Sequence, residues 1–283
     1  MTTLKDQIAR FQERRLRNII KNVLLSNSDA IVDSFSSIVD KLNLDQITTL
    51  TKAICNVYRE SELPQKVIDL LESYSGGRLH YSQEGEDILL TRILDVEYPG
   101  FFIDVGAHHP VRFSNTYGLY KRGWRGINID PTPGSMESFQ RLRPEDINLE
   151  CAISLDETPI PFFIFTEGAL NTFDVKLAKE YLDKGWVLKE TLEIKPRPLS
   201  DILKNHLKLN KFVTLLTIDV EGLEMEVLSS NDWDVCRPKV IIIEALSIPL
   251  LALESFPPVS YLMAKGYVPT SRLVNSVILQ RME

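Results

Sequence analysis

Four acidic residues, each at the end of an apolar run, are the groups in this sequence best placed to do chemistry. The runs lie at residues 101–104, 126–130, 212–219 and 240–244, and they end in Asp104, Asp130, Asp219 and Glu244. Short apolar runs bounded by turn residues predict buried strands of a parallel sheet. Ligands of open α/β sheets bind outside the carboxyl ends of such strands. We therefore expect the four carboxylates to lie around one ligand site.

The segment that follows the first run is typical of a tight ligand loop. It reads Asp104-Val105-Gly106-Ala107-His108-His109-Pro110, and its glycine, which has no Cβ, would let the backbone approach a ligand closely. The acid that ends the second run, Asp130, is placed to accept hydrogen bonds from ribose hydroxyls. Together these features predict a cofactor that contains a nucleoside. The alternative is an ordinary βαβ unit whose aspartates only cap helices.

This loop has one glycine instead of the Gly-x-Gly-x-x-Gly pattern of dinucleotide sites. A pyrophosphate needs several backbone amides at a helix start, whereas S-adenosylmethionine carries no phosphate. The pattern therefore favours S-adenosylmethionine and disfavours a nicotinamide oxidoreductase. The residues expected around this cofactor are Gln83, Asp104, Gly106, Ala107, Asp130, Pro131 and Ala152. Of these, Gln83 would lie beside the methionine end and Ala152 against the adenine ring.

The acids of the last two runs predict the reacting end of the site. Carboxylates that crowd together repel one another unless they share a ligand, and a divalent metal with oxygen ligands, Mg²⁺ or Mn²⁺, is one candidate. Asp219 and Glu244 would hold that metal, or else the hydroxyls of an acceptor. We expect a catalytic role for Asp219, with His108 or Glu221 as general base. The candidate substrate contacts are Asn115, Asn171 and Thr172, although turn formation is the more common reason for such residues in a loop.

The composition excludes several classes of protein. The chain has 283 residues, a net charge of −7, 44% hydrophobic and 25% charged residues, which are values of a soluble globular protein. An acidic chain is a poor partner for a nucleic-acid backbone. Three scattered cysteines form no zinc or disulfide pattern and predict a reducing compartment. With neither a signal-peptide pattern nor an apolar run of about 20 residues, we expect a cytoplasmic protein without a transmembrane segment.

The elements that must position these groups fall into two predicted domains. Residues 1–77 carry apolar residues at helical spacing and predict an all-helical extension that ends at Gly76-Gly77. Residues 78–283 predict an α/β domain with a mixed, mostly parallel sheet. Within it, residues 158–195 interrupt the alternation of strands and helices as an insertion near the site, and residues 250–265 predict one helix. The extension is expected to pack on the α/β domain, to form a homodimer, or to cover a substrate cleft.

Several motifs of the chain resemble those of the FkbM-type methyltransferases. They are Ser82-Gln83-Glu84-Gly85-Glu86-Asp87, Asp104 to Pro110, Ser114-Asn115-Thr116-Tyr117, Gly123-Trp124-Arg125-Gly126-Ile127, Asp130-Pro131 and Asp219-Val220-Glu221-Gly222. The resemblance covers roughly residues 80 to 246 and leaves the helical extension outside. It implies a class I methyltransferase fold, which is Rossmann-like, and S-adenosylmethionine-dependent methylation of a hydroxyl.

Site residues follow from the resemblance position by position. Asp104, Gly106 and Ala107 would line the cofactor. Asp130 would hold the ribose, where members of the family often have a glutamate. Asp219 and Glu221 would sit at the catalytic end. The motifs do not decide whether a metal is required.

The function expected from all of this is O-methylation of a sugar, a glycan or a nucleotide-sugar-type acceptor. One alternative is O-methylation of a polyketide or another secondary metabolite. A second, of a different class, is a non-catalytic α/β binding module that assembles through its helical arm. The identity of the acceptor hydroxyl is not encoded in any motif of the chain.

Overall fold

The computed structural model describes residues 80–207 and 212–282. The predicted helical extension at residues 1–77, and the homodimer contacts expected of it, lie outside the described residues. The fold below is therefore that of the α/β domain.

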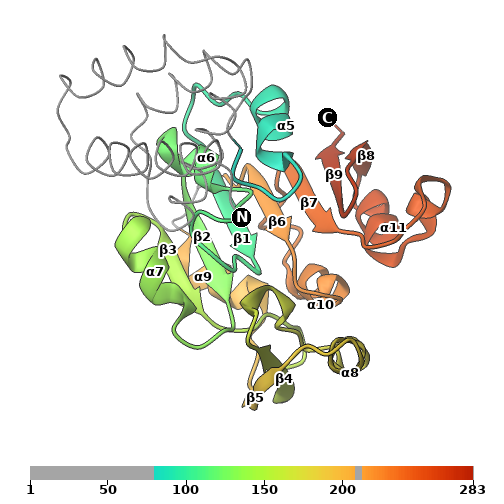
Figure 1. The fold of residues 1–283 in the computed structure, drawn as a ribbon. Helices are drawn as coiled ribbons and strands as arrows, with labels where there is room; N and C mark the ends of the chain where they lie inside the picture. Colours follow the sequence, from blue (N-terminus) through green and yellow to red (C-terminus); the bar gives the residue numbers. More distant parts are fainter. Residues whose placement is uncertain (1–79, 208–211, 283) are drawn as a thin grey trace, which may run out of the picture. The chain divides into compact units, whose positions relative to one another are not determined.

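This domain is built on one seven-stranded sheet. Its strands are β1 (Phe101–Val105), β2 (Arg125–Asp130), β3 (Ile147–Glu150), β6 (Leu215–Ile218), β7 (Val240–Glu244), β8 (Tyr267–Arg272) and β9 (Ser276–Arg281). They lie in the order β3-β2-β1-β6-β7-β9-β8, and only β9 pairs antiparallel, with β7 on one side and β8 on the other (Figure 1). The predicted mixed, mostly parallel sheet is confirmed.

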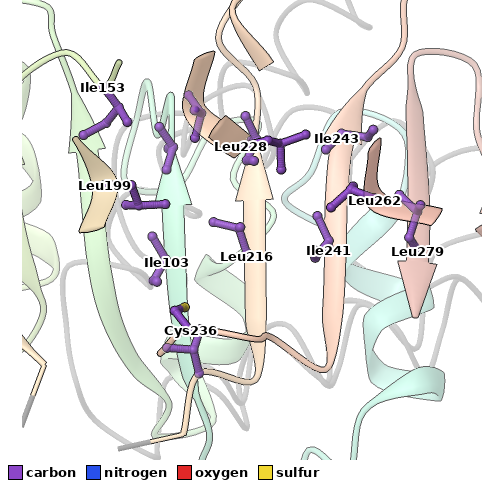
Figure 2. Packing of buried hydrophobic residues seen from close by; sticks show 14 of the residues in the cluster. Ile103, Ile153, Leu199, Leu216, Leu228, Cys236, Ile241, Ile243, Leu262 and Leu279 are labelled. Atoms are coloured by element: carbon purple, nitrogen blue, oxygen red, sulfur yellow. The ribbon is translucent and has the colours of Figure 1, made fainter. Parts of the chain in front are cut away.

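Helices cover both faces of the sheet because its central strands are apolar on both sides. The helices are α5 (Glu86–Ile93), α6 (Tyr117–Lys121), α7 (Ser135–Leu142), α9 (Leu199–His206), α10 (Glu224–Ser230) and α11 (Pro257–Ala264). Successive strand residues point to opposite faces, so Ile103 belongs to a cluster that includes residues of α9, α10 and α11, whereas Phe102 belongs to one that includes residues of α5 and α6. Figure 2 shows the first of these clusters, with Leu216 and Ile241 among its members. Among the helices of the described ranges, none has the length and apolar character to cross a bilayer.

The insertion forms a small unit of its own between β3 and α9. It contains β4 (Ile160–Phe165), the 3₁₀ helix η1 (Gly168–Leu170), α8 (Val175–Asp183) and β5 (Leu188–Ile194). β4 and β5 pair antiparallel as a separate two-stranded sheet (Figure 1). Asp174 caps α8, since its carboxylate accepts hydrogen bonds from the backbone amides of Lys176 and Leu177.

The single helix predicted over residues 250–265 is wrong. The segment is divided into a 3₁₀ helix, η2 (Leu250–Ser255), and α11, with Phe256 extended between them. Pro257 and Pro258 have no backbone N–H to continue the first helix, but the first turn of a new helix tolerates them.

Candidate active site

The loop after β1 folds back onto β2 and uses its own amides in doing so. The backbone N–H groups of Gly106 and Ala107 both donate to the carbonyl of Ile129, at 2.9 and 3.0 Å. The N–H of His108 donates to Asp130 Oδ2 at 3.0 Å. Amides that a pyrophosphate would need are therefore already bonded within the protein. The loop is suited to a cofactor without phosphates.

The structure requires a glycine at position 106 for a different reason from the one predicted from the sequence. Its φ is +82°, and a Cβ at this position would run into the carbonyl oxygen of Asp219. The glycine thus lets the loop after β1 cross the end of β6, in a conformation that L-residues rarely adopt. It lines the cavity described below, but the close approach that it permits is to backbone.

The carboxylates of Asp104 and Asp130 are each held by hydrogen bonds. Asp104 Oδ2 accepts from the Thr116 hydroxyl at 2.7 Å. Asp130 Oδ1 accepts from the N–H of Thr132 at 2.8 Å, in addition to the bond of Oδ2 to His108. Every carboxylate oxygen can accept a second hydrogen bond, so both residues keep capacity for a ligand. Burial raises the pKa of Asp104 to about 6.

His108 lies on the same side of the site as Asp130. Its φ of +53° places a non-glycine residue in the left-handed region. Burial lowers the pKa of its imidazole, while the charge of Asp130 opposes that shift and the charge of Arg112 adds to it. The imidazole is therefore mainly neutral at neutral pH and able to accept a proton.

Three carboxylates meet where β6 and β7 end, and we call Asp219, Glu221 and Glu244 the acidic cluster. One carboxylate oxygen from each lies within 4.8 Å of the others. Desolvation by the surrounding protein, and then repulsion by neighbouring acids, raises the pKa of all three groups. Asp219 is exposed by its accessible surface and lines the cavity. Glu221 also has a left-handed backbone, with φ +52°.

A cavity of about 330 Å³ joins the two groups of carboxylates. Thirteen of the fourteen residues predicted for the site line it: Gln83, Asp104, Gly106, Ala107, His108, Asn115, Asp130, Pro131, Ala152, Asn171, Asp219, Glu221 and Glu244. The four strand-end acids therefore surround one space, because parallel strands end at the same edge of the sheet.

The three predicted substrate contacts have structural partners. Asn171 accepts from the N–H of Phe165 and donates to the Thr132 hydroxyl, so it joins the insertion to the loop after β2. Asn115 donates to Thr217 Oγ1 on β6 at 3.0 Å. Thr172 is buried and does not line the cavity; its hydroxyl donates to the Glu221 carbonyl at 3.4 Å. Thr172 thus contacts the backbone of the acidic cluster from within the protein.

Several residues that line the cavity are not predicted by any pattern in the sequence. Tyr181, on α8, places its hydroxyl 3.5 Å from Glu221 Oε2. Asn275, between β8 and β9, is held by a hydrogen bond from its N–H to Glu84 Oε2 at 2.9 Å. The aromatic rings of Phe162 and Phe173 also line the cavity, with centroids 4.4 Å apart. An aromatic residue in an amphipathic helix and an asparagine in a turn are too common to be singled out without coordinates.

The family to which these motifs belong is shown by a direct match. The Methyltransferase FkbM domain matches residues 104–264, which is more than half of the chain. The chain belongs to the FkbM methyltransferase family. It is therefore a methyltransferase with a class I, Rossmann-like fold, and the match includes Asp104, Asp130, the whole insertion and the acidic cluster.

Solved structures of other methyltransferases resemble this FkbM methyltransferase at low identity. Methyltransferase FkbM from Methylobacillus flagellatus KT is 14% identical with a TM-score of 0.42, over 88% of this chain and 58% of that one. The present chain thus spans less than two thirds of that protein. An O-methyltransferase from Bacillus cereus in complex with SAH is 10% identical with a TM-score of 0.41, over 85% of this chain and 100% of that one. No curated protein matches the sequence. The assignment rests on the family match.

Proposed function

We propose that this FkbM methyltransferase transfers a methyl group from S-adenosylmethionine to a hydroxyl of a sugar, a glycan or a nucleotide-sugar-type acceptor. The observation that carries the proposal is the acidic cluster, which opens to the same cavity as Asp104 and Asp130. Several carboxylates can accept hydrogen bonds from the neighbouring hydroxyls of one polyhydroxylated acceptor. An acceptor with a single hydroxyl would leave most of them unsatisfied.

The side of the cavity formed by the β1 and β2 loops fits the cofactor. Asp104 offers a carboxylate oxygen for an ammonium group, and Asp130 offers one for ribose hydroxyls. Ala152 and Phe162 supply small and apolar surface for an adenine ring. When bound, S-adenosylmethionine supplies a methyl group made electrophilic by the positively charged sulfur. The volume of about 330 Å³ lies within the range of roughly 300–1,000 Å³ of ligand pockets.

The acceptor hydroxyl must lose its proton as its oxygen takes the methyl group, and we assign that proton to Glu221. Burial and the nearby Glu224 raise the pKa of Glu221, so the group can hold a proton near neutral pH. His108 is the second candidate base. Its charged neighbours are Asp130, Arg112 and Glu167, and its backbone N–H donates to Asp130 on the cofactor side, which favours Glu221 for the acceptor side.

Asp219 and Glu244 are proposed to hold a divalent metal. Their oxygen donors suit Mg²⁺ or Mn²⁺, and a cation would relieve the repulsion that raises their pKa values. The metal would supply Lewis acidity to the acceptor oxygen. The two residues would fix its position, and acceptor oxygens or water would complete its ligands.

The metal proposal is tested by exhaustive chelation followed by titration with Mn²⁺. Electron paramagnetic resonance of free Mn²⁺ gives a readout that does not depend on turnover. We expect one site that is lost in Glu244→Gln. Full activity after chelation, with no bound Mn²⁺, would leave the carboxylates as hydrogen-bond acceptors for the acceptor alone.

Acceptor class is tested with a panel of sugars, nucleotide sugars and phenolic polyketides, and the methylated product is identified by mass spectrometry. The aromatic ring of Phe173, a residue of the insertion that lines the cavity, favours the polyketide alternative. Activity on polyketides alone would therefore select that second function. Calorimetric binding of S-adenosylmethionine without transfer to any acceptor would point to a binding module.

A further inference from the structure

A chain of buried polar side chains runs from Asp104 into the protein, away from the cavity. The Thr116 hydroxyl donates to Asp104 Oδ2 at 2.7 Å, and Arg143 Nη1 donates to Thr116 Oγ1 at 3.1 Å. Arg143 Nε pairs with Asp146 Oδ2 at 2.8 Å. Thr116 and Arg143 are both 0% exposed. The Asp104 carboxylate is thus connected to a buried ion pair just beyond α7.

The direction of the hydrogen bonds in this chain is fixed by chemistry. A guanidinium can only donate, so the Thr116 oxygen must accept from Arg143. The single hydroxyl proton of Thr116 is then directed at Asp104 Oδ2. In the described part of the chain Asp104 Oδ1 receives no hydrogen bond, and Asp104 lines the cavity. The arrangement therefore bonds one oxygen of Asp104 internally and leaves the other for a ligand.

The burial of Arg143 needs an explanation beyond packing. Its charge is balanced by Asp146, whose carboxylate also accepts from the N–H of Gly126 at 2.9 Å and from Asn128 Nδ2 at 3.1 Å. Its guanidinium lies over the rings of Phe102, Tyr120 and Phe139. Apolar residues of similar volume often replace a buried ion pair without loss of stability. Stability alone therefore does not account for Arg143, which reaches the site through its hydrogen bond to Thr116.

We propose that Thr116 and Arg143 are positioning residues that orient the Asp104 carboxylate, with Oδ1 toward the cavity, to receive the ammonium group of S-adenosylmethionine. The inference rests on the proposed function, because it takes the cofactor to bind in this cavity. Neither residue touches the cofactor, since both are enclosed by protein.

The electrostatics around Asp104 give this arrangement a pH signature. Burial raises its pKa to about 6, and the hydrogen bond from Thr116 and the charge of Arg143 hold it from rising further. The other acids that face it are Asp146, Asp130 and Asp219. A carboxyl group is neutral below its pKa, so affinity for a cationic ligand falls as the pH falls through this value. Without the Thr116 hydroxyl the pKa rises, and the loss of affinity moves to higher pH.

The test uses Thr116→Val, which removes the hydroxyl at nearly constant volume, and Thr116→Ser, which keeps it. Binding of S-adenosylmethionine to the full chain is measured by calorimetry from pH 5 to pH 8. For Thr116→Val we expect a Kd about tenfold higher at pH 7, since one hydrogen bond to a charged group is lost, and an acid midpoint at higher pH. Thr116→Ser should restore both. A purely structural role would not move the midpoint of a folded variant.

The outcomes separate this inference from the proposed function. Wild-type binding together with an unchanged Kd and midpoint in Thr116→Val would overturn the inference alone. No binding by wild type at any pH would overturn the proposed function and the inference with it. Should Thr116→Val fail to fold, Asp104→Asn replaces it, with weak binding expected at every pH. Wild-type affinity and pH dependence in Asp104→Asn would refute the role of the carboxylate that Thr116 and Arg143 are proposed to hold.

Discussion

The two sides of the cavity hold their carboxylates in opposite ways. On the side formed by the loops after β1 and β2, Asp104 and Asp130 each accept hydrogen bonds from protein groups. On the side formed after β6 and β7, among the described residues, the carboxylates of Asp219 and Glu244 receive none. Glu221 receives one from Tyr181, at 3.5 Å. One side is satisfied by the fold, and the other is not.

This difference suggests that the two sides of the cavity have different roles. Hydrogen-bonded carboxylates are fixed before a ligand arrives and lose little freedom on binding. Crowded carboxylates with raised pKa values repel one another until a cation or a set of hydroxyls neutralises them. We therefore expect cofactor affinity to depend on the first side and turnover on the second.

The largest effect is expected when the acidic cluster loses a charge. Asp219→Asn should lower kcat by about 100-fold or more, because base or metal assistance is lost, and should change the Kd for S-adenosylmethionine less than about threefold, since the Asp104 side is intact. Steady-state kinetics and calorimetry measure the two. Asp234→Asn, an exposed acid outside the cavity lining, is the control. Equal losses in kcat and affinity would erase the division between the two sides.

A steric test examines the point where the two sides touch. Gly106→Ala combines a φ of +82° with an overlap of the new Cβ and the Asp219 carbonyl. Gly134→Ala has nearly the same φ, +77°, but nothing within 4 Å of the new Cβ. We expect about 1 kcal/mol of destabilisation for Gly134→Ala and about 3 kcal/mol for Gly106→Ala, from strain plus overpacking. Urea denaturation measures both, and equal losses would mean that the overlap is relieved by a small shift of the loop.

A smaller effect is expected for the side that is already hydrogen-bonded. Asp130→Asn keeps the shape of the side chain but replaces one acceptor oxygen with a donor, so a backbone N–H of His108 or Thr132 loses its partner. The Kd for S-adenosylmethionine should rise about tenfold, with kcat at saturation little changed. The matched control is Glu150→Gln, an acid at the end of β3 that also accepts a backbone N–H, from Gly134, but does not line the cavity. A loss of kcat without a change in Kd would reverse the assignment.

The smallest effect is a pH dependence of stability in the ligand-free, chelated protein. Burial and the charges of Asp219 and Glu221 raise the pKa of Glu244 to about 10, so the folded state retains a proton that the unfolded chain releases above about pH 4. The contribution of this group to stability is therefore largest at low pH. It falls as the pH rises from about 4 toward the pKa of the group in the folded state. Between pH 5 and pH 8 we expect Tm to fall further in wild type than in Glu244→Gln, because only in wild type does the unfolded chain release a proton that the folded state keeps. If calorimetry gave the same dependence of Tm on pH for both proteins, Glu244 would not be the group responsible for it.

The strands that build the site, and the acids at their ends, could be predicted from the sequence because they depend on local chemistry. The apolar run before Asp104 and the one before Glu244 are β1 and β7. Parallel pairing then brings strand ends together whatever the intervening segments do, so four acids predicted to meet line one cavity. The break before Pro257 is also a local effect, because Pro257 and Pro258 have no backbone N–H with which to continue a helix.

The contacts that each site residue makes were harder to predict than its position in the fold. Gly106 was expected to make room for a ligand, whereas it makes room for the Asp219 carbonyl. The sequence predicts substrate contacts for Asn171 and Thr172, and the structure adds hydrogen bonds through which they tie the insertion to the loops after β2 and β6. In each case the deciding contact comes from a residue at least 39 positions away, and no local pattern specifies it.

By itself the sequence determined the strands, the order of motifs and the acids at the strand ends, because periodicity and turn chemistry act over a few residues. Only the tertiary structure decided which groups complete the site: Asn275 bonded to Glu84 across 191 positions, and Arg143 behind Thr116 and Asp104. These contacts depend on how loops cross and how faces pack, and those depend on the whole chain folding at once.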